Sequence, residues 1–279
     1  MTSANRTGRL RWLGLALSLA VVPGLLWAAD RAGKAPAADQ AKPVAETVEM
    51  FAAIEAEQIE VKLIPKDSTE CRVFIKNKTD KPLSIKLPEA FAGVPVLGQF
   101  GGGGMGGMGG GGMGGMGGGG NQGMGGGMGG MGGGGMGGGG MGGMGGGGGG
   151  FFNVPPEKVG DFKVTTVCLE HGKREPRPKM KYEIKPIEEL TDKPEVREVC
   201  RMLGYGMLPQ RAAQVAAWHL NSNMSWQQLA GKQLHYADGT RSPYFSQQEI
   251  RGGMQVVAAA AKLAKEREES GKQGSLSQK

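Results

Sequence analysis

Apolar and polar residues alternate with a period of two in several segments of this chain. The alternation runs through 59–63, 71–76, 83–87 and 180–185, and residues 162–169 form a further run rich in β-branched residues. Successive side chains of a strand point to opposite faces, so this pattern predicts half-buried strands. Proline, asparagine, aspartate and serine separate the first three segments and are typical of turns. Short strands at such turn-marked spacing favour a small antiparallel β-sandwich.

Helical spacing appears in two other places. Val48, Phe51 and Ile54 predict a short helix within 45–58. Beyond Leu190 apolar residues recur every three or four positions, which predicts a bundle of about four helices over 188–270. Three pairs have the spacing of a capping box at a helix start: Asp192 with Glu195, Ser225 with Gln228, and Ser246 with Glu249.

Residues 101–150 interrupt the strands with glycine, ten methionines, and the single pair Asn121-Gln122. We call this segment the Gly/Met tract, and we expect it to be disordered because it offers little apolar surface to bury. Neither set of flanking strands closes a good sandwich alone, so we expect one β-domain, 46–100 plus 151–187, split by the tract. Lengthening a loop from about 5 to about 50 residues costs roughly 2 kcal/mol, which a domain tolerates. Two independent small domains remain the alternative.

The N-terminus has the three parts of a secretory signal peptide. Arginines come first, an apolar run interrupted by Pro23-Gly24 follows, and the small residues Ala28-Ala29 end it. We therefore predict a signal peptide over 1–28, a flexible leader over 29–45 and a disordered tail over 271–279. The protein is then exported to the periplasm, the cell envelope or the extracellular space. The alternative is an uncleaved N-terminal anchor, since the apolar run is close to the length of a membrane span.

The distribution of charge along the chain argues against nucleic acid as a partner. The chain has a formal net charge of +7. Three positive charges, Arg6, Arg9 and Arg11, belong to the predicted signal, which leaves +4 for the mature chain. The remaining lysines and arginines are interleaved with glutamates, as in 179–185 and 262–269, whereas a nucleic-acid footprint gathers basic residues on one face.

Methionine pairs in the Gly/Met tract are the candidate metal ligands. Thioethers are soft ligands that suit Cu(I). The pairs spaced by three positions are Met105 and Met108, Met113 and Met116, Met128 and Met131, and Met141 and Met144. A repeat tolerated because it is disordered is the competing interpretation, as is a methionine-dotted spacer that associates with itself.

Three cysteines leave one thiol unpaired if a disulfide forms. Cys71 and Cys168 each share the apolar face of a predicted strand, so we expect a candidate disulfide between them across the two halves of the split domain. Cys168 also begins Cys-Leu-Glu-His171, which has the spacing of half a zinc site but lacks a second close pair. The same residues, with Glu170, are the only local candidates for a thiol-dependent enzyme, although 168 and 171 are of opposite strand parity. Cys200 lies on a predicted apolar helix stripe, as a buried residue would.

Two segments resemble exported bacterial proteins of unknown function. They are residues 59–89, with Glu-Val-Lys-Leu-Ile-Pro-Lys-Asp-Ser and Ile-Lys-Asn-Lys-Thr-Asp-Lys-Pro-Leu, and residues 164–178, with Val-Thr-Thr-Val-Cys-Leu-Glu-His-Gly-Lys-Arg-Glu-Pro-Arg-Pro. The resemblance implies an immunoglobulin-like β-part followed by helices, together with export, and implies no activity. The core tryptophan of true immunoglobulin domains is missing, because no tryptophan lies between Trp27 and Trp218.

The sequence therefore predicts an α+β protein with an immunoglobulin-like sandwich, a disordered Gly/Met tract and a helical bundle. The predicted role is an exported, non-enzymatic binding or structural module without a cofactor, whose partner is an unknown protein or envelope component. A Cu(I)-binding protein acting through the methionine pairs is the first alternative. A thiol-dependent enzyme using Cys168 is the second.

Overall fold

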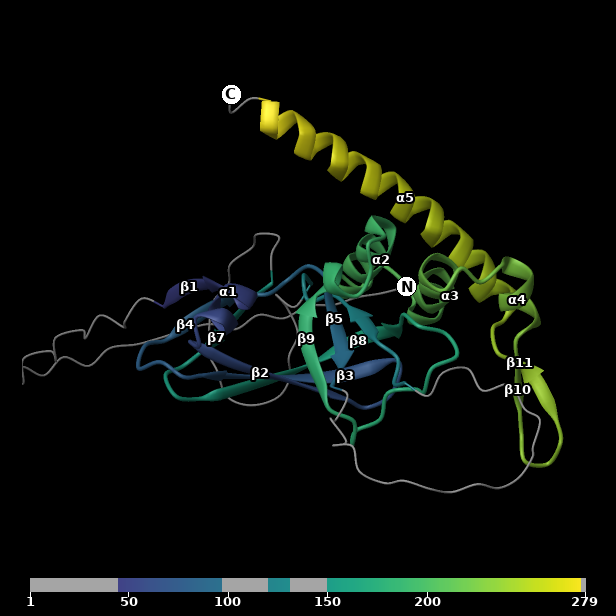
Figure 1. Cartoon of the computed structure of the whole chain (residues 1–279), viewed down its shortest axis with the longest axis horizontal. Helices are drawn as coiled ribbons and strands as arrows, with labels where there is room; N and C mark the ends of the chain where they lie inside the picture. The colour runs from purple at the N-terminus through teal and green to yellow at the C-terminus, as the bar shows by residue number, and fades with distance from the viewer. Residues whose placement is uncertain (1–44, 97–119, 131–149, 277–279) are drawn as a thin grey trace, which may run out of the picture. The chain divides into compact units, whose positions relative to one another are not determined.

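The computed structural model describes residues 45–96, 120–130 and 150–276 (Figure 1). The predicted signal peptide and leader lie outside the described residues, apart from Ala45. The strands are β1 Glu46–Glu49, β2 Ile59–Pro65, β3 Glu70–Asn77, β4 Leu83–Lys86, β5 Phe91–Pro95, β6 Met124–Gly126, β7 Phe151–Val154, β8 Val159–Cys168, β9 Tyr182–Pro186, β10 Gln233–His235 and β11 Arg241–Pro243. The helices are α1 Met50–Glu55, the 3-10 turn η1 Ile187–Glu189, α2 Pro194–Gly204, α3 Gln210–Asn221, α4 Trp226–Gly231 and α5 Gln247–Leu276.

Six strands close into an antiparallel barrel in the order β2-β3-β8-β6-β5-β9. The ring closes where Leu63 of β2 pairs with Tyr182 of β9. The expectation of an immunoglobulin-like sandwich is therefore wrong, while the α+β class holds. The sequence pattern had shown the strands corresponding to β2, β3, β8 and β9, and it missed β5 and β6, without which the sheet cannot close.

A second sheet has the order β1-β4-β7, with β1 parallel and β7 antiparallel to β4. This sheet corrects the prediction of one helix over 45–58. Residues Glu46–Glu49 are a strand, and the helix begins only at Met50, with the Glu49 side chain accepting from the amide of Ala52. Parallel pairing of β1 with β4 satisfies backbone groups that an isolated short helix would leave partly exposed.

The middle of the Gly/Met tract is part of the barrel. Residues 124–126 form β6 between β5 and β8, and Met124 and Met128 are fully buried in the barrel core. The prediction that all of 101–150 is disordered is therefore wrong for 120–130. Residues 101–119 and 131–149 of the tract lie outside the described residues.

Glycine is required where the tract crosses α2. A Cβ on Gly127 would collide with the carbonyl oxygens of Glu89 and Cys200, and a Cβ on Gly204 would collide with the backbone of Gly127. The two backbones touch because neither residue has a side chain. This contact sets how closely the tract approaches the C-terminal end of α2.

The helices pack on the outside of the barrel and share a core with it. Ala92 of β5 and Val167 and Leu169 at β8 belong to the same buried cluster as Val199 of α2 and Ala216 of α3. Figure 1 shows α2 and α3 beside the strands, both in contact with β8, and α5 packed across α2 and α3. The boundary predicted near Leu190 is thus a change of secondary structure, and the hydrophobic core continues across it.

Helix ends partly follow the predicted capping boxes. The Ser225 and Gln228 box is present, and Ser246 and Glu249 exchange reciprocal hydrogen bonds of 2.8 and 3.2 Å. The box at Asp192 is not formed, because α2 begins at Pro194 and its N-cap is Lys193.

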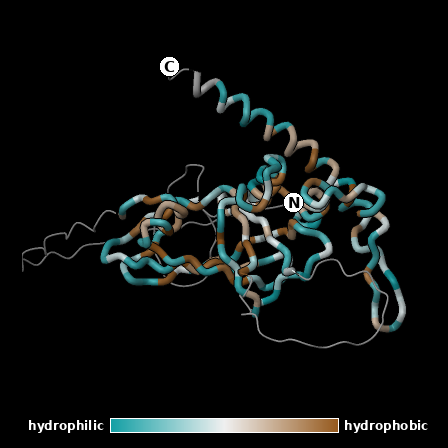
Figure 2. Tube along the Cα trace, viewed as in Figure 1, coloured by the Kyte–Doolittle hydropathy of each residue, from teal (hydrophilic) through white to brown (hydrophobic). Residues whose placement is uncertain are grey.

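The last helix is longer than the sequence pattern indicated. α5 continues to Leu276, so the predicted disordered tail 271–279 is wrong for 271–276, and 277–279 lie outside the described residues. Figure 2 colours its C-terminal half largely as hydrophilic, in keeping with the charged residues of 262–272.

Candidate functional site

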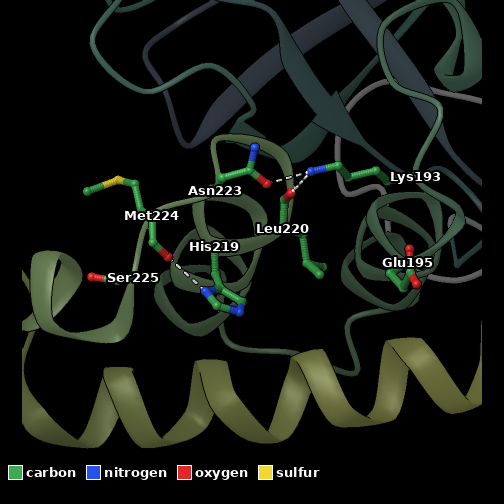
Figure 3. Close-up of a pocket in the computed structure, with 7 residues that line it drawn as sticks. All are labelled: Lys193, Glu195, His219, Leu220, Asn223, Met224 and Ser225. Atoms are coloured by element: carbon green, nitrogen blue, oxygen red, sulfur yellow. Dashed lines mark hydrogen bonds between the residues drawn. The ribbon is translucent and has the colours of Figure 1, made fainter.

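An open hollow of about 490 Å³ lies where the start of α2, the end of α3 and the start of α4 meet (Figure 3). We call it the helical pocket. Five of its seven lining residues are polar, and the lining comes from two stretches of sequence, 193–195 and 219–225. The lining residues are Lys193, Glu195, His219, Leu220, Asn223, Met224 and Ser225.

Lys193 connects the stretches 193–195 and 219–225 through hydrogen bonds. Its ammonium donates to the carbonyl oxygen of Leu220 and, at 2.8 Å, to Oδ1 of Asn223. Asn223 has a left-handed backbone with φ of +54°, a conformation that asparagine tolerates better than most residues. The lysine thereby caps the end of α3 and positions the turn that leads to α4.

His219 is oriented from two sides. Its Nδ1 lies 2.8 Å from the carbonyl oxygen of Met224, and its ring stacks on Trp226 with centroids 3.9 Å apart and planes 20° from parallel. A carbonyl oxygen only accepts, so Nδ1 is the donor in this hydrogen bond. Ser225 has a separate task, because its hydroxyl oxygen accepts from the amide of Gln228 at the start of α4.

The helical pocket therefore combines one ammonium, one carboxylate and one imidazole around an open volume. Such a set suits recognition of a polar group through hydrogen bonds and charge. Sequence analysis had singled out none of Lys193, Glu195 and His219 as a site. Only the capping box at Ser225 marked this place in the sequence.

The candidate thiol site is not assembled. Cys168 is buried, its amide and carbonyl are both held by the Gln214 side chain at 2.8 Å, and burial raises the pKa of its thiol above the usual range. His171 instead packs its ring edge-on to Trp218 and lies 3.0 Å from the Lys232 ammonium. A reactive cysteine needs a lowered pKa, so this environment argues against the thiol-dependent enzyme.

The surroundings of His171 disfavour its protonated form. Burial and the positive charge of Lys232 lower the pKa of the imidazole, and burial also lowers the pKa of Lys232. The ammonium donates to Nε2 of the ring, which is possible only while that nitrogen is unprotonated. The contact between His171 and Lys232 holds the loop after β8 against the end of α4, next to the hairpin of β10 and β11.

Cys71, Cys168 and Cys200 are all free and buried, so the candidate disulfide between Cys71 and Cys168 is not formed. The register of β3 and β8 explains the error. Cys71 pairs with Val164, and Cys168 lies four positions farther along β8, which places it about 13 Å away, beyond the reach of a disulfide.

The metal predictions fall largely outside what the structure describes. Met128 is buried in the barrel core, away from any role as an exposed ligand, while Met105, Met108, Met113, Met116, Met131, Met141 and Met144 lie outside the described residues. Across residues 45–96, 120–130 and 150–276, histidine, cysteine, aspartate and glutamate form no group of three suited to a metal ion. The half zinc site at Cys168 and His171 gains no second half among them.

Burial of the thiols predicts a loss of stability in alkali. The ordinary pKa of a thiol here is 9.0, and burial raises the pKa of Cys71 and of Cys200 to about 12. Between these values the unfolded chain releases protons that the folded chain keeps, so the stability present below pH 9 is lost as pH rises. Each thiol contributes a slope of roughly 1.4 kcal/mol per pH unit.

Urea unfolding at several pH values between 8 and 11 checks this slope. In the Cys200→Ala variant the free energy of unfolding should fall less steeply with pH than in wild type, and the difference in slope should equal the contribution of one thiol. Equal slopes in both proteins would contradict burial of Cys200.

Comparison of the chain with protein-family models, with curated proteins and with solved structures gave no match. No helix in the described ranges is both long enough and apolar enough to cross a membrane.

Proposed function

We propose that this protein is an exported, non-enzymatic binding or structural module of the cell envelope or extracellular space. In this proposal the helical pocket holds a polar group of a protein or other envelope component. The observation behind it is the convergence of Lys193, Glu195 and His219 on one open hollow. Export rests on the signal-like pattern of residues 1–28.

The pocket chemistry favours recognition over covalent catalysis. The hydroxyl of Ser225 is used to cap α4, and His219 is stacked on Trp226 and bonded to a backbone carbonyl. These contacts hold the polar groups in place before a partner arrives, and such preorganisation lowers the entropic cost of binding.

Capture from fractionated native cells tests the proposal. The tagged full-length chain is expected in the envelope or extracellular fraction, together with a bound partner. A Glu195→Gln/His219→Gln variant should capture about tenfold less of that partner, as expected when central polar contacts are removed. The control Lys265→Gln changes a residue on α5 that is 78% exposed and should capture the wild-type amount.

Both variants should be folded, with melting temperatures within about 5 °C of wild type. Equal capture by the pocket variant and wild type would remove the pocket from the proposal. A chain found only in the cytoplasm would remove export.

A further inference from the structure

Strand β6 is a short insert that completes the barrel. It pairs with β5 through Gly93 opposite Met124 and with β8 through Thr166 opposite Gly126. β5 and β8 have no direct pairing with each other, so they would present two open edges without it. We call the space between β5, β8 and α2 that the tract fills the β6 groove.

The β6 groove is selective for its occupant. Met124 and Met128 fill buried positions in the barrel core, and the close approach of Gly127 to α2 excludes a side chain there. A Cβ on Gly125 would lie 2.6 Å from Sγ of Cys200, so that position also requires glycine.

Further contacts lock the start of the segment. The Tyr182 hydroxyl donates to the carbonyl oxygen of Gln122 at 2.8 Å, and the amide of Gly123 donates to Oε2 of Glu170 at 2.8 Å. These bonds and the two buried methionines define one register of the tract in the groove.

Only one segment of this chain meets these requirements. Met124 and Met128 are the only two methionines of the tract that stand four positions apart, and Asn121-Gln122 is its only departure from glycine and methionine. A segment offered by another molecule must meet the same requirements, and residues 121–130 of a second copy of this chain meet all of them.

The connections are long enough for such a transfer. Twenty-three residues, 97–119, join the described end at Val96 to Gly120, and nineteen residues, 131–149, join Gly130 to Gly150. Fully extended chains of these lengths reach roughly 60–80 Å, which is several times the spacing of about 10 Å between packed sheets. Gly-rich chains of this size have a root-mean-square span of about 25 Å.

We propose that the β6 groove binds residues 121–130 of a second copy of this chain, so that two copies are joined by exchange of β6. This is independent of the proposed function of the helical pocket. Every contact of β6 is remade in the exchanged dimer, and protein concentration decides between the two forms. A strand tethered by connections of this length has an effective concentration of order mM, so monomers dominate at μM concentration and exchanged dimers form as the concentration approaches mM.

Complementation between two defective full-length chains tests the exchange. Gly127→Val disables the segment and leaves the groove intact, whereas Gly204→Val obstructs the groove and leaves the segment intact. The two chains carry different tags and are refolded together or separately. The expected result is a mixed dimer, recovered through both tags at about tenfold the amount given by either variant mixed with itself.

The control is Gly231→Val, because a Cβ at Gly231 meets no atom within 4 Å. This variant should behave as wild type. Mixed with Gly127→Val, it should give no more mixed dimer than wild type mixed with Gly127→Val gives. Failure of the defective pair to give mixed dimers would overturn the proposal.

A second measurement does not depend on the variants folding alone. Two tagged wild-type chains are refolded together at μM and near-mM concentration, and co-purification through both tags is measured. Exchange predicts at least about a tenfold higher mixed fraction at the higher concentration. A fraction that stays at the background level at both concentrations would also overturn the proposal.

Discussion

Replacing Met124 by alanine is expected to lower the free energy of unfolding by about 2–5 kcal/mol, the usual cost of truncating a fully buried methionine. Met124 is 0% exposed and lies in the barrel core with Leu63 and Phe91. Met128 is equally buried, and its truncation should cost a similar amount. These are large effects for residues within a glycine-rich repeat.

Urea denaturation of three substitutions checks this expectation. Met124→Leu keeps most of the volume and should cost less than about 1.5 kcal/mol. Met207→Ala is the matched control, because that side chain is 64% exposed, and its change should stay within about 0.5 kcal/mol. If Met124→Ala were as neutral as Met207→Ala, the tract would not be part of the folded barrel.

Removing the cations around Glu198 is expected to cost about 3–5 kcal/mol, because a buried carboxylate would be left unpaired. The Glu198 side chain is 1% exposed. Its two oxygens accept from Nε of Arg201 at 2.7 Å and Nε of Arg267 at 2.8 Å. Arg267 also lies 3.1 Å from Glu89, so this cluster joins α5 to α2 and to the loop before β5.

The informative comparison is between a double and a triple variant. Arg201→Met/Arg267→Met leaves the charge of Glu198 unpaired, and adding Glu198→Met removes that charge. The triple variant should therefore be more stable than the double variant. Lys265→Met disrupts only an exposed pair with Glu269 and should change stability by less than about 1 kcal/mol. Equal stability of the double and triple variants, measured by urea unfolding, would show that the cost comes from lost packing.

Much of the barrel could be predicted from the chain because its strands are half buried. Cys71, Val73 and Ile75 alternate with exposed or half-buried residues in β3, and all three are 0% exposed. The predicted strands at β2, β8 and β9 are also confirmed as strands. Alternation shows which face of each strand is buried but does not determine the order of the strands. The same strands are therefore compatible with a sandwich, and it is β6, between β5 and β8, that completes a closed barrel.

β6 could not be predicted from its own residues. Glycine is depleted in strands, and a run of glycine and methionine has no polar face to alternate with an apolar one. The strand exists because β5 and β8 offer open edges and α2 offers a glycine at Gly204, and these partners are distant in sequence. The helical pocket was missed for the same reason, since Lys193 and His219 meet only through the packing of α2 on α3.

The anchored centre of the tract divides it into parts with different tolerance to changes in length. Doubling the residue count on either side of 120–130 adds only about 0.6 kcal/mol of loop-closure cost. One glycine inserted between Met124 and Met128 shifts the second methionine out of its buried position. Repeat expansion or contraction in the coding sequence should therefore change stability little on either side of residues 120–130. The same change within the five codons for 124–128 should destabilise the barrel.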